Sequence, residues 1–274
     1  MKATLIFLLM HFVVIGATLS SCAGQALRIA TLNLHWDNRR IDQALVAVAA
    51  ANADIVCFQE TTKESERVLR DRLSNTHPHF CAIGHQGRYM EERFAIVSRL
   101  PLRATEFHPP EAGLFGFYEA AFDVGNEPVN LVNVHLSPFI IPRGAGLMGT
   151  MAAIKEVENK HLDEAKAICA AIDVSEPTII VGDFNSLATL AAPQHLAQKG
   201  FIDSFAAVHE KADAHPTWRF PTRPVPMRLR IDHIFHSPHF VSLESEIINN
   251  TGSDHSLVVS ELKLVEMNAV EVPP

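Results

Sequence analysis

Several apolar segments of the sequence end in, contain or follow side chains that can bind metal ions or phosphates. These side chains are Asn33, Glu60, His135, Asp183 with Asn185, Asp232, and the run Ser253-Asp254-His255. Carboxylate and amide oxygens are hard ligands of the kind that Mg²⁺ takes, and histidine exchanges protons near neutral pH. A single glutamate after a strand is usually a solvated loop residue, and a single histidine in a strand is usually structural. Six such positions in succession instead favour one shared site.

The hydrophobic pattern predicts the elements that position these residues. Alternating or continuous apolar residues predict strands over residues 27–34, 54–58, 94–98, 116–124, 129–136, 177–181, 230–235 and 257–264. Residues 125–128 are predicted to join two of these strands in a hairpin. Helical spacing predicts a helix over residues 41–48 that Asp37 or Asn38 caps, and an amphipathic helix over 63–73. A long helix is predicted over 148–172, with core positions at Ile154, Val157, Leu162, Ala165 and Ile168.

Strands outnumber helices in this prediction, and the two kinds alternate along the chain. Both hairpin and crossover connections occur, which indicates an α/β fold of mixed sheets with helices packed outside. We expect one domain over residues 27–265 and a flexible tail over residues 266–274.

The polar residues at the segment ends resemble the motifs of the endonuclease/exonuclease/phosphatase superfamily. The ordered set is Asn33, Gln59-Glu60, His135, Gly182-Asp183-Phe184-Asn185, Asp232 and Ser253-Asp254-His255, and it extends over residues 27–264. The resemblance implies a four-layer α/β sandwich, in which two central mixed β-sheets are flanked by α-helices. It also implies cleavage of a phosphate ester with a divalent metal, usually Mg²⁺, with Mn²⁺ or Ca²⁺ as alternatives.

The resemblance also assigns roles to individual residues. Glu60 is the expected first metal ligand, with Asn33 and Asp254 beside it. Asp183 and Asn185, which share a side in extended backbone, are expected to orient the attacking water and to donate a hydrogen bond to the phosphate. Asp232 is expected to fix the tautomer of His255. His135 is expected to protonate or stabilise the leaving oxygen.

Other histidines are assigned no role. His35 replaces an aspartate that helps to hold metal in some branches of the superfamily, and either the site or solvent is a reasonable environment for it. His233, His236 and His239 are expected to be surface residues of a strand and loop.

Two segments bear on which phosphate ester is cleaved. Residues 217–230 combine Trp218 with several arginines, of which Arg219 and Arg230 are the predicted substrate-binding residues. Guanidinium groups pair with phosphates and Trp218 suits stacking on a base or ring, although a solvated proline-rich loop explains the segment nearly as well. Residues 138–150 form an apolar, glycine-bearing loop, and its Phe139-Ile140-Ile141 run suits contact with lipid, closure over substrate, or a plain connection.

Composition limits the function classes. Hydrophobic residues make up 47% and charged residues 20% of the chain, which excludes wholesale disorder. The formal net charge of −8 disfavours a protein that coats nucleic acid through a strongly basic surface, although a local basic groove is compatible with it. The spacing of the four cysteines matches no zinc site, and Cys57 and Cys169 are predicted to be small buried hydrophobic residues.

The first residues predict export. Lys2 precedes an apolar run that is too short to cross a bilayer, which is typical of a signal peptide. Leu19-Ser20-Ser21-Cys22 resembles a bacterial lipobox, so we expect a signal peptide over residues 1–21, lipidation at Cys22, and a short tether over 22–26. The predicted location is a cell membrane, as a bacterial lipoprotein. With ordinary cleavage near Ala23 or Ala26 instead, the protein would be periplasmic or secreted.

These observations favour a secreted or membrane-tethered, metal-dependent phosphodiesterase or nuclease that acts as a monomer. A sphingomyelinase-type phospholipase or an inositol-phosphate phosphatase is the alternative, so the predicted partner is a nucleic acid or a phospholipid head group. A non-enzymatic binding module that retains the fold is disfavoured, because every expected catalytic position carries a functional side chain.

Overall fold

A computed structural model of the chain describes residues 26–84, 93–111, 113–139, 144, 146–221 and 226–265. The predicted signal peptide, the Cys22 lipidation site and the C-terminal tail lie outside these residues, as do Ile140, Ile141 and Arg223. The predicted domain boundaries therefore stay predictions. Among the described residues, none of the helices has both the length and the apolar character needed to cross a bilayer.

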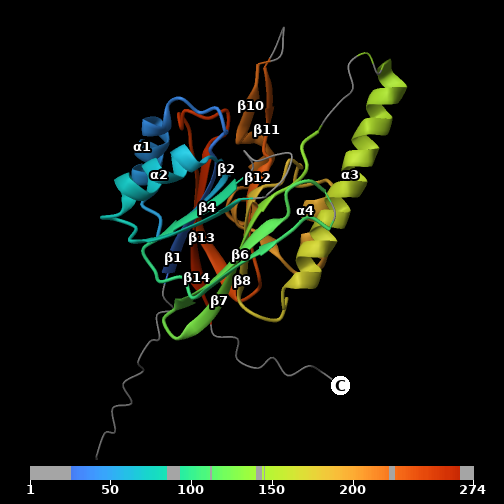
Figure 1. The fold of residues 1–274 in the computed structure, drawn as a ribbon. Helices are drawn as coiled ribbons and strands as arrows, with labels where there is room; N and C mark the ends of the chain where they lie inside the picture. The colour runs from blue at the N-terminus through green and yellow to red at the C-terminus, as the bar shows by residue number, and fades with distance from the viewer. Residues whose placement is uncertain are drawn as a thin grey trace, which may run out of the picture.

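Two six-stranded sheets form the centre of the fold (Figure 1). The first has the order β13 (Phe240–Ile248), β14 (Leu257–Leu264), β1 (Ala26–Asn33), β2 (Ile55–Thr61), β4 (Arg93–Ser98) and β3 (His79–Gly84). The second has the order β5 (Ala104–His108), β6 (Phe117–Val124), β7 (Glu127–His135), β8 (Thr178–Asp183), β12 (Asp232–His236) and β9 (Ile202–Asp203). A separate hairpin of β10 (Trp218–Phe220) and β11 (Met227–Leu229) projects from one end of the molecule.

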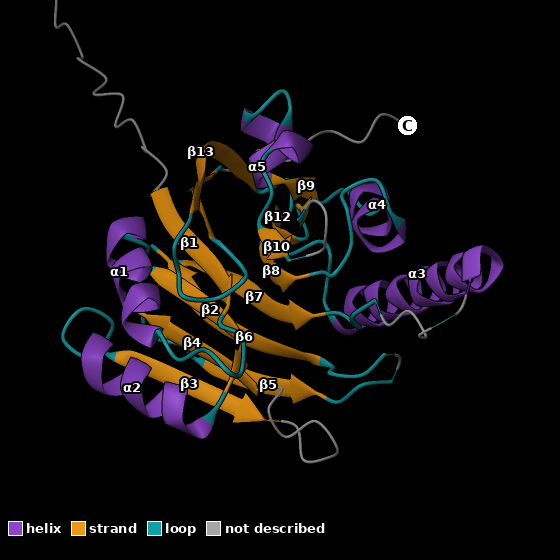
Figure 2. Ribbon diagram, turned by 90° about the horizontal axis from the view of Figure 1, so that it is seen from above, coloured by secondary structure: helices purple, strands orange, loops and turns teal. Residues whose placement is uncertain are grey.

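Helices cover the outer faces of both sheets (Figure 2). On the first sheet lie α1 (Ile41–Ala51) and α2 (Lys63–Leu73), and on the second lie α3 (Gly146–Ala171) and α4 (Ala191–Gln198). A short helix, α5 (Ser204–Val208), packs near β12 and β13. The expected four-layer α/β sandwich with two mixed sheets is therefore confirmed.

Three apolar clusters hold the four layers together. One lies between the sheets and includes Ile29, Phe122 and Val181. A second joins α1 and α2 to the first sheet, and a third joins α3 and α4 to the second. Burial of apolar area on both faces explains why β2 and β8 are nearly continuous apolar runs.

Each sheet contains one parallel pair near its centre, and this arrangement positions the site. β1 pairs parallel with β2 and β7 pairs parallel with β8, whereas the other neighbours are antiparallel. The connections between the parallel pairs contain α1 and α3 respectively. The C-terminal ends of four strands consequently converge at one end of the sandwich.

Some local predictions were wrong. The N-cap of α1 is Arg40, which makes no side-chain capping bond, while Asn38 accepts the Arg40 backbone N–H at 2.8 Å. Ile154 is 41% exposed, because its part of α3 lies outside the buried contact with the second sheet, whereas Val157, Ala165 and Ile168 are buried as expected. The predicted 230–235 strand begins at Asp232.

Candidate active site

The register of the strands places the expected residues in two adjacent groups. In the second sheet, His135 pairs with Asp183, and Asp183 pairs with Asp232, so three neighbouring strands contribute one row of side chains. In the first sheet, Asn33 pairs with Gln59, one residue before Glu60. Since directly paired residues of a sheet face the same side, the row of the second sheet presents its polar groups together.

The backbone turns sharply just after β1 and β8 and at an irregularity within β2, and these turns orient the side chains. His35, Glu60 and Asn185 have φ angles of 61°, 52° and 47°, which few residues other than glycine adopt. Short-range bonds fix two of these positions: the His35 N–H donates to Asn33 Oδ1 at 2.9 Å, and the Asn185 N–H donates to Asp183 Oδ1 at 2.8 Å. Backbone strain of this kind is often concentrated at functional sites.

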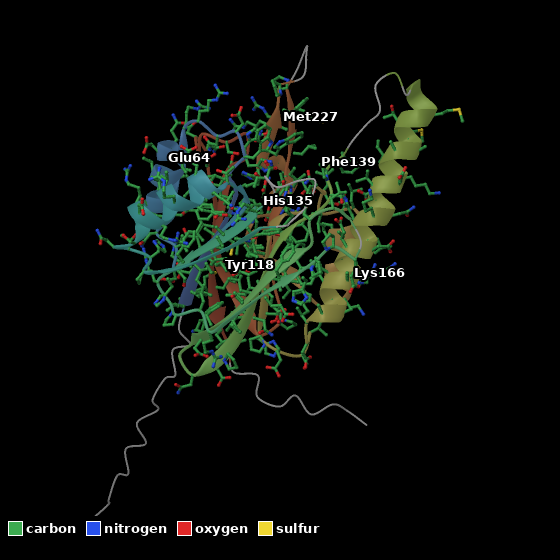
Figure 3. The ribbon with its side chains drawn as sticks, viewed as in Figure 1. Glu64, Tyr118, His135, Phe139, Lys166 and Met227 are labelled. Carbon is green, nitrogen blue, oxygen red and sulfur yellow. The ribbon has the colours of Figure 1, made fainter. Side chains whose placement is uncertain are left out.

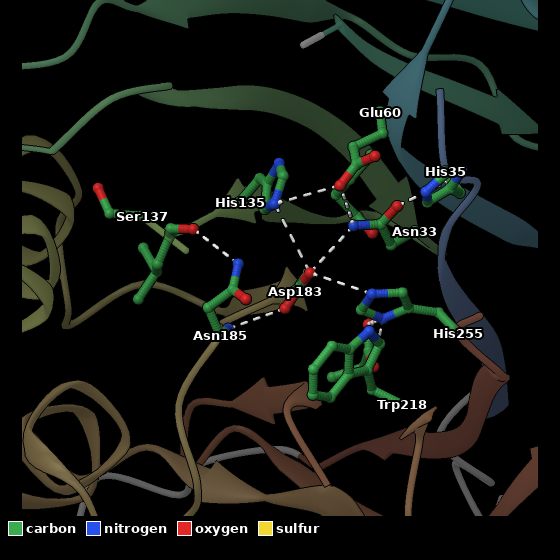
Figure 4. Close-up of polar contacts among 12 residues, drawn as sticks. Asn33, His35, Glu60, His135, Ser137, Asp183, Asn185, Trp218 and His255 are labelled. Carbon is green, nitrogen blue, oxygen red and sulfur yellow. Dashed lines mark hydrogen bonds and ion pairs between the residues drawn. The ribbon is translucent and has the colours of Figure 1, made fainter. Parts of the chain in front are cut away.

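Asn33 connects the two groups (Figure 4). Its Nδ2 donates to Glu60 Oε1 at 2.9 Å and to Asp183 Oδ2 at 3.0 Å, so one amide links carboxylates from different sheets. The His135 Nε2 lies 3.6 Å from Asp183 Oδ2 and 3.8 Å from Glu60 Oε1. The His135 ring stacks on Phe115 with centroids 4.6 Å apart, which restricts its orientation. Because Asn33 uses its amide nitrogen in this way and its oxygen accepts from His35, its role as a metal ligand stays a prediction.

His255 lies between two aspartates. Its Nδ1 is 3.0 Å from both oxygens of Asp232, and its Nε2 is 3.6 Å from Asp183 Oδ2. Burial lowers the pKa of His255, but the charges of Asp232 and Asp183 outweigh burial and raise this pKa to about 10. Burial raises the pKa of Asp183 to about 6, against the opposing effect of the His255 charge. The geometry is that of an imidazolium held between a fixed partner and a carboxylate that can accept a proton.

Glu60 is the most accessible carboxylate of the central group, with 15% of its side chain exposed. Burial raises its pKa, but the His135 charge and the hydrogen bond from Asn33 outweigh burial and lower the pKa below its ordinary value. Trp36 N–H adds a bond to Glu60 Oε2 at 3.2 Å. Glu60 therefore offers an ionised hard-oxygen ligand, which suits Mg²⁺ because this ion needs only one or two carboxylates and keeps several waters.

Asp254 adjoins this group through Trp218 and Ser253. Its Oδ2 accepts the Trp218 indole N–H at 2.9 Å, and the Ser253 hydroxyl donates to the Asn33 carbonyl at 2.9 Å. Among the described residues, Asp183, Asp232 and His255 offer ligand atoms that all lie within 4.8 Å of one another. This set differs from the expected ligands Asn33, Glu60 and Asp254. Asp232 and His255 are already hydrogen-bonded to each other, so Glu60 is the stronger candidate to anchor a cation.

The two arginines predicted to bind substrate have different environments. Arg219 is exposed, whereas Arg230 is 2% exposed, and its guanidinium lies 2.7 Å from Asp203 and 3.2 Å from Asp213. This buried ion pair explains Arg230 structurally and corrects its assignment as a substrate contact. His233 and His236 are likewise buried, not on the surface: His233 Nδ1 lies 3.1 Å from Asp203, and His236 contacts Ser242 and the Ser237 carbonyl.

A further carboxylate supports the site and was not predicted. Glu164 of α3 is buried and accepts the Ser137 N–H at 3.1 Å and the Ser137 hydroxyl at 2.9 Å. His161, one turn earlier, contacts the Ser137 carbonyl at 2.6 Å. Phe139 packs edge-on against His161, which gives this part of the apolar loop a partner within the protein. Nothing in the spacing of α3 distinguishes Glu164 from its other glutamates.

This group of carboxylates and histidines suits the hydrolysis of a phosphate ester, and comparison with known proteins shows the class to which the chain belongs. Residues 30–255 match the Endonuclease/Exonuclease/phosphatase family, so the chain belongs to this family, whose members hydrolyse phosphate-ester bonds. The expected family is thereby confirmed. No curated protein matches the sequence significantly.

Solved structures share the fold at low sequence identity. An endonuclease/exonuclease/phosphatase from Beutenbergia cavernae is 20% identical with a TM-score of 0.65, covering 88% of this chain and 72% of that one. TDP2 from D. rerio, complexed with a single-strand DNA product, is 16% identical with a TM-score of 0.65, covering 87% and 99%. A Bacteroides vulgatus endonuclease/exonuclease/phosphatase is 18% identical with a TM-score of 0.64, covering 88% and 100%.

Proposed function

We propose that the protein is a divalent-metal-dependent phosphodiesterase of the nuclease type, which hydrolyses a P–O bond by attack of water. The observation that carries this proposal is the position of Asp183, whose Oδ2 lies within 3.6 Å of Asn33, His135 and His255. The proton acceptor Asp183, the imidazoles of His135 and His255, and the ionised metal ligand Glu60 thus lie in one group. Hydrolysis of a phosphate ester requires such a base, such hydrogen-bond donors and such a ligand.

Each side chain has a separate role in the proposed reaction. Asp183 accepts a proton from the attacking water, and its pKa of about 6 leaves it ionised at neutral pH. His255, whose Nδ1 is held by Asp232, donates one hydrogen bond from its Nε2 to a phosphate oxygen on which negative charge develops. Asn185 holds Asp183 through its backbone N–H, and His135 donates a proton to the leaving oxygen as the P–O bond breaks.

Glu60, with Asp254 and Asn33 beside it, would hold the cation. A divalent ion bound there supplies Lewis-acid stabilisation of the phosphate charge. Asn33 keeps Glu60 and Asp183 at fixed separation, because one amide nitrogen bonds to both. The similarity in fold to TDP2 complexed with single-strand DNA supports a nucleic-acid substrate over a lipid head group.

A substrate panel tests the proposal. The purified protein is incubated with plasmid DNA, single-stranded DNA, sphingomyelin and inositol phosphates, each with Mg²⁺ and with chelator. The proposal expects cleavage of nucleic acid that chelator stops. Cleavage of sphingomyelin or inositol phosphates alone would favour the alternative substrates, and hydrolysis of none would contradict the proposal.

We also propose that the protein is exported and lipidated at Cys22, on the basis of the apolar run and the lipobox-like residues 19–22. Cys22→Ala should move the protein from the membrane fraction to the soluble fraction of the exporting cell. A wild-type protein that is found only in the soluble fraction would overturn the lipidation.

A further inference from the structure

Three arginines stand out because they have no acidic partner. Among the residues that the structure describes, every other arginine has a carboxylate at ion-pair distance or, for Arg70, lies over the Phe80 ring. Arg40, Arg219 and Arg228 have neither, although the protein carries a net charge of −8. Arg219 donates to Asn249 Oδ1 at 2.8 Å and Arg40 donates to the Gly252 carbonyl at 3.5 Å, and both acceptors are neutral. Exposed guanidiniums without an acidic partner are available to an anionic ligand in an acidic protein.

These arginines lie together beside the candidate active site. Arg40 and Arg219 line one hollow, whose remaining wall includes Ser253, Asp254 and His255. Arg228 is the direct cross-strand partner of Arg219 in the β10–β11 hairpin. Like charges in directly opposed positions of a β-ribbon destabilise it, and an anion that binds between them removes this penalty.

The other face of the same hairpin is aromatic and apolar. Trp218 stacks on Phe220 with centroids 5.5 Å apart and planes 22° apart, and cross-strand pairing adds Met227 and Leu229. Trp218 is fixed by Asp254 and lies 6.3 Å from the His255 ring, while Phe220 and Met227 are 47% and 43% exposed. Figure 3 shows Met227 on this projecting hairpin, beyond His135. The rings therefore continue from the candidate active site toward solvent.

We infer that the β10–β11 hairpin is a binding element for single-stranded nucleic acid. The Trp218–Phe220 pair stacks on an unpaired base next to the scissile phosphate, and Arg40, Arg219 and Arg228 pair with neighbouring phosphates of the strand. Flat rings in a parallel stack fit a base, and a row of guanidiniums fits a chain of phosphates, which is the combination that single-strand binding uses. This inference rests on the proposed phosphodiesterase function and names its substrate class.

The two tryptophans of the chain permit a direct test. In an inactive Glu60→Gln background, Trp36→Phe leaves Trp218 as the sole tryptophan, and its fluorescence is titrated with a short oligothymidylate. The inference expects saturable quenching that weakens as salt is raised. Trp218 fluorescence that does not respond to oligothymidylate, or that responds only to phosphatidylglycerol vesicles, would overturn it.

Substitutions on each face of the hairpin sharpen the test. Arg219→Gln/Arg228→Gln should weaken oligothymidylate binding about tenfold and flatten the slope of log affinity against log salt by about 1.4, because each single-strand phosphate contact contributes about 0.7. The control Arg103→Gln/Lys166→Gln removes the same charge from residues that pair with Asp123 and Asp163, and it should leave binding unchanged. An equal loss in both double variants would contradict the inference.

Phe220→Leu separates a base from an apolar ligand, since leucine keeps the hydrophobic surface and removes the ring. Binding of oligothymidylate should fall about tenfold, because stacking of one base is lost. Unchanged binding would exclude stacking at Phe220. The binding measurements use an inactive protein and the hydrolysis measurements use the wild type, so the two claims are tested separately. Oligothymidylate binding without hydrolysis by the wild type would reject the proposed function alone. Hydrolysis of a small aryl phosphodiester without oligothymidylate binding would reject the hairpin inference alone.

Discussion

The Glu164 carboxylate accepts two hydrogen bonds from Ser137, one from the Ser137 backbone N–H at 3.1 Å and one from the Ser137 hydroxyl at 2.9 Å. The peptide that carries this N–H also carries the Leu136 carbonyl, which accepts the Asn185 side-chain amide at 2.9 Å. The Gly113 backbone also packs against the Glu164 carboxylate, two residues before the Phe115 ring that stacks on His135. One carboxylate on α3 thereby orients both Asn185 and His135.

Glu164→Ala should therefore lower kcat about tenfold while KM changes little, because the loss of Ser137 anchoring displaces groups that act in the transition state. Glu164→Gln keeps one acceptor oxygen and should recover most of the rate. Steady-state kinetics on an aryl phosphodiester measure both variants. Glu156→Ala, on the exposed part of the same helix, is the control, and an alanine variant at position 164 that is as active as this control would refute the role.

Gly182 allows β8 to approach β7 closely just before Asp183. It has a φ of 145°, and a Cβ at this position would lie 1.9 Å from the Val134 carbonyl oxygen. Gly182→Ala should lower the free energy of unfolding by about 3 kcal/mol or more, because both backbone strain and a clash with buried backbone result. Urea unfolding measures the change. Gly200→Ala, where the nearest atom to a new Cβ is 3.9 Å away, is the control for strain alone, and equal effects would show that the clash contributes nothing.

Asp203 and Arg230 form the buried ion pair that replaces the expected substrate contact. Burial raises the pKa of Asp203, but the hydrogen bond from His233 and the charges of His233 and Arg230 outweigh burial and hold this pKa well below its ordinary value. Asp203→Asn keeps the Oδ1 acceptor that caps α5, but it replaces Oδ2 by an amide NH2, so it removes both the charge and the acceptor that face Arg230. The variant should lose about 3 kcal/mol of stability at neutral pH, since Arg230 is left buried with only half-exposed Asp213 as its acidic partner.

The pH dependence of this loss has a definite sign. A carboxyl whose pKa is lowered in the folded state stabilises the protein fully above its unfolded pKa of about 3.9, and this stabilisation disappears as pH falls below that value. The stability difference between wild type and Asp203→Asn should therefore be constant near neutral pH and should narrow below about pH 4. A difference that is the same at low and neutral pH would contradict the charge-based explanation.

The strands that the sequence analysis missed in the two large sheets are β13, β3, β5 and β9, and all four are sheet edges. An edge strand needs less apolar surface than a central strand and often carries charge, as the half-exposed β13 does with Glu244 and Glu246. Hydrophobic periodicity detects burial, so it identified the central strands and with them the polar residues at their ends.

The site could not be predicted fully, because some of its residues have ion-pair or hydrogen-bond partners that lie far away in the sequence. The arginine-rich segment predicts Arg230 as a substrate contact, and no local pattern reveals its acidic partners, Asp203 and Asp213, which lie 27 and 17 residues earlier in the chain. Glu164 was missed for a similar reason, since Ser137 lies on a different element 27 residues before it. Strand-end motifs predicted which residues meet, whereas the bonds that orient them depend on packing that no local pattern encodes.

The central claim is that Glu60, Asp183 and His255 act together on a phosphate ester with a divalent cation. The most direct measurement is the rate of aryl phosphodiester hydrolysis across a Mg²⁺ titration, after chelation, for the wild type, Glu60→Gln and the exposed neighbour Glu64→Gln. We predict that the wild type and Glu64→Gln regain activity with Mg²⁺, while Glu60→Gln stays about a hundredfold slower at every concentration. A wild type that is unaffected by chelation, or a Glu60→Gln variant that matches it, would contradict the claim.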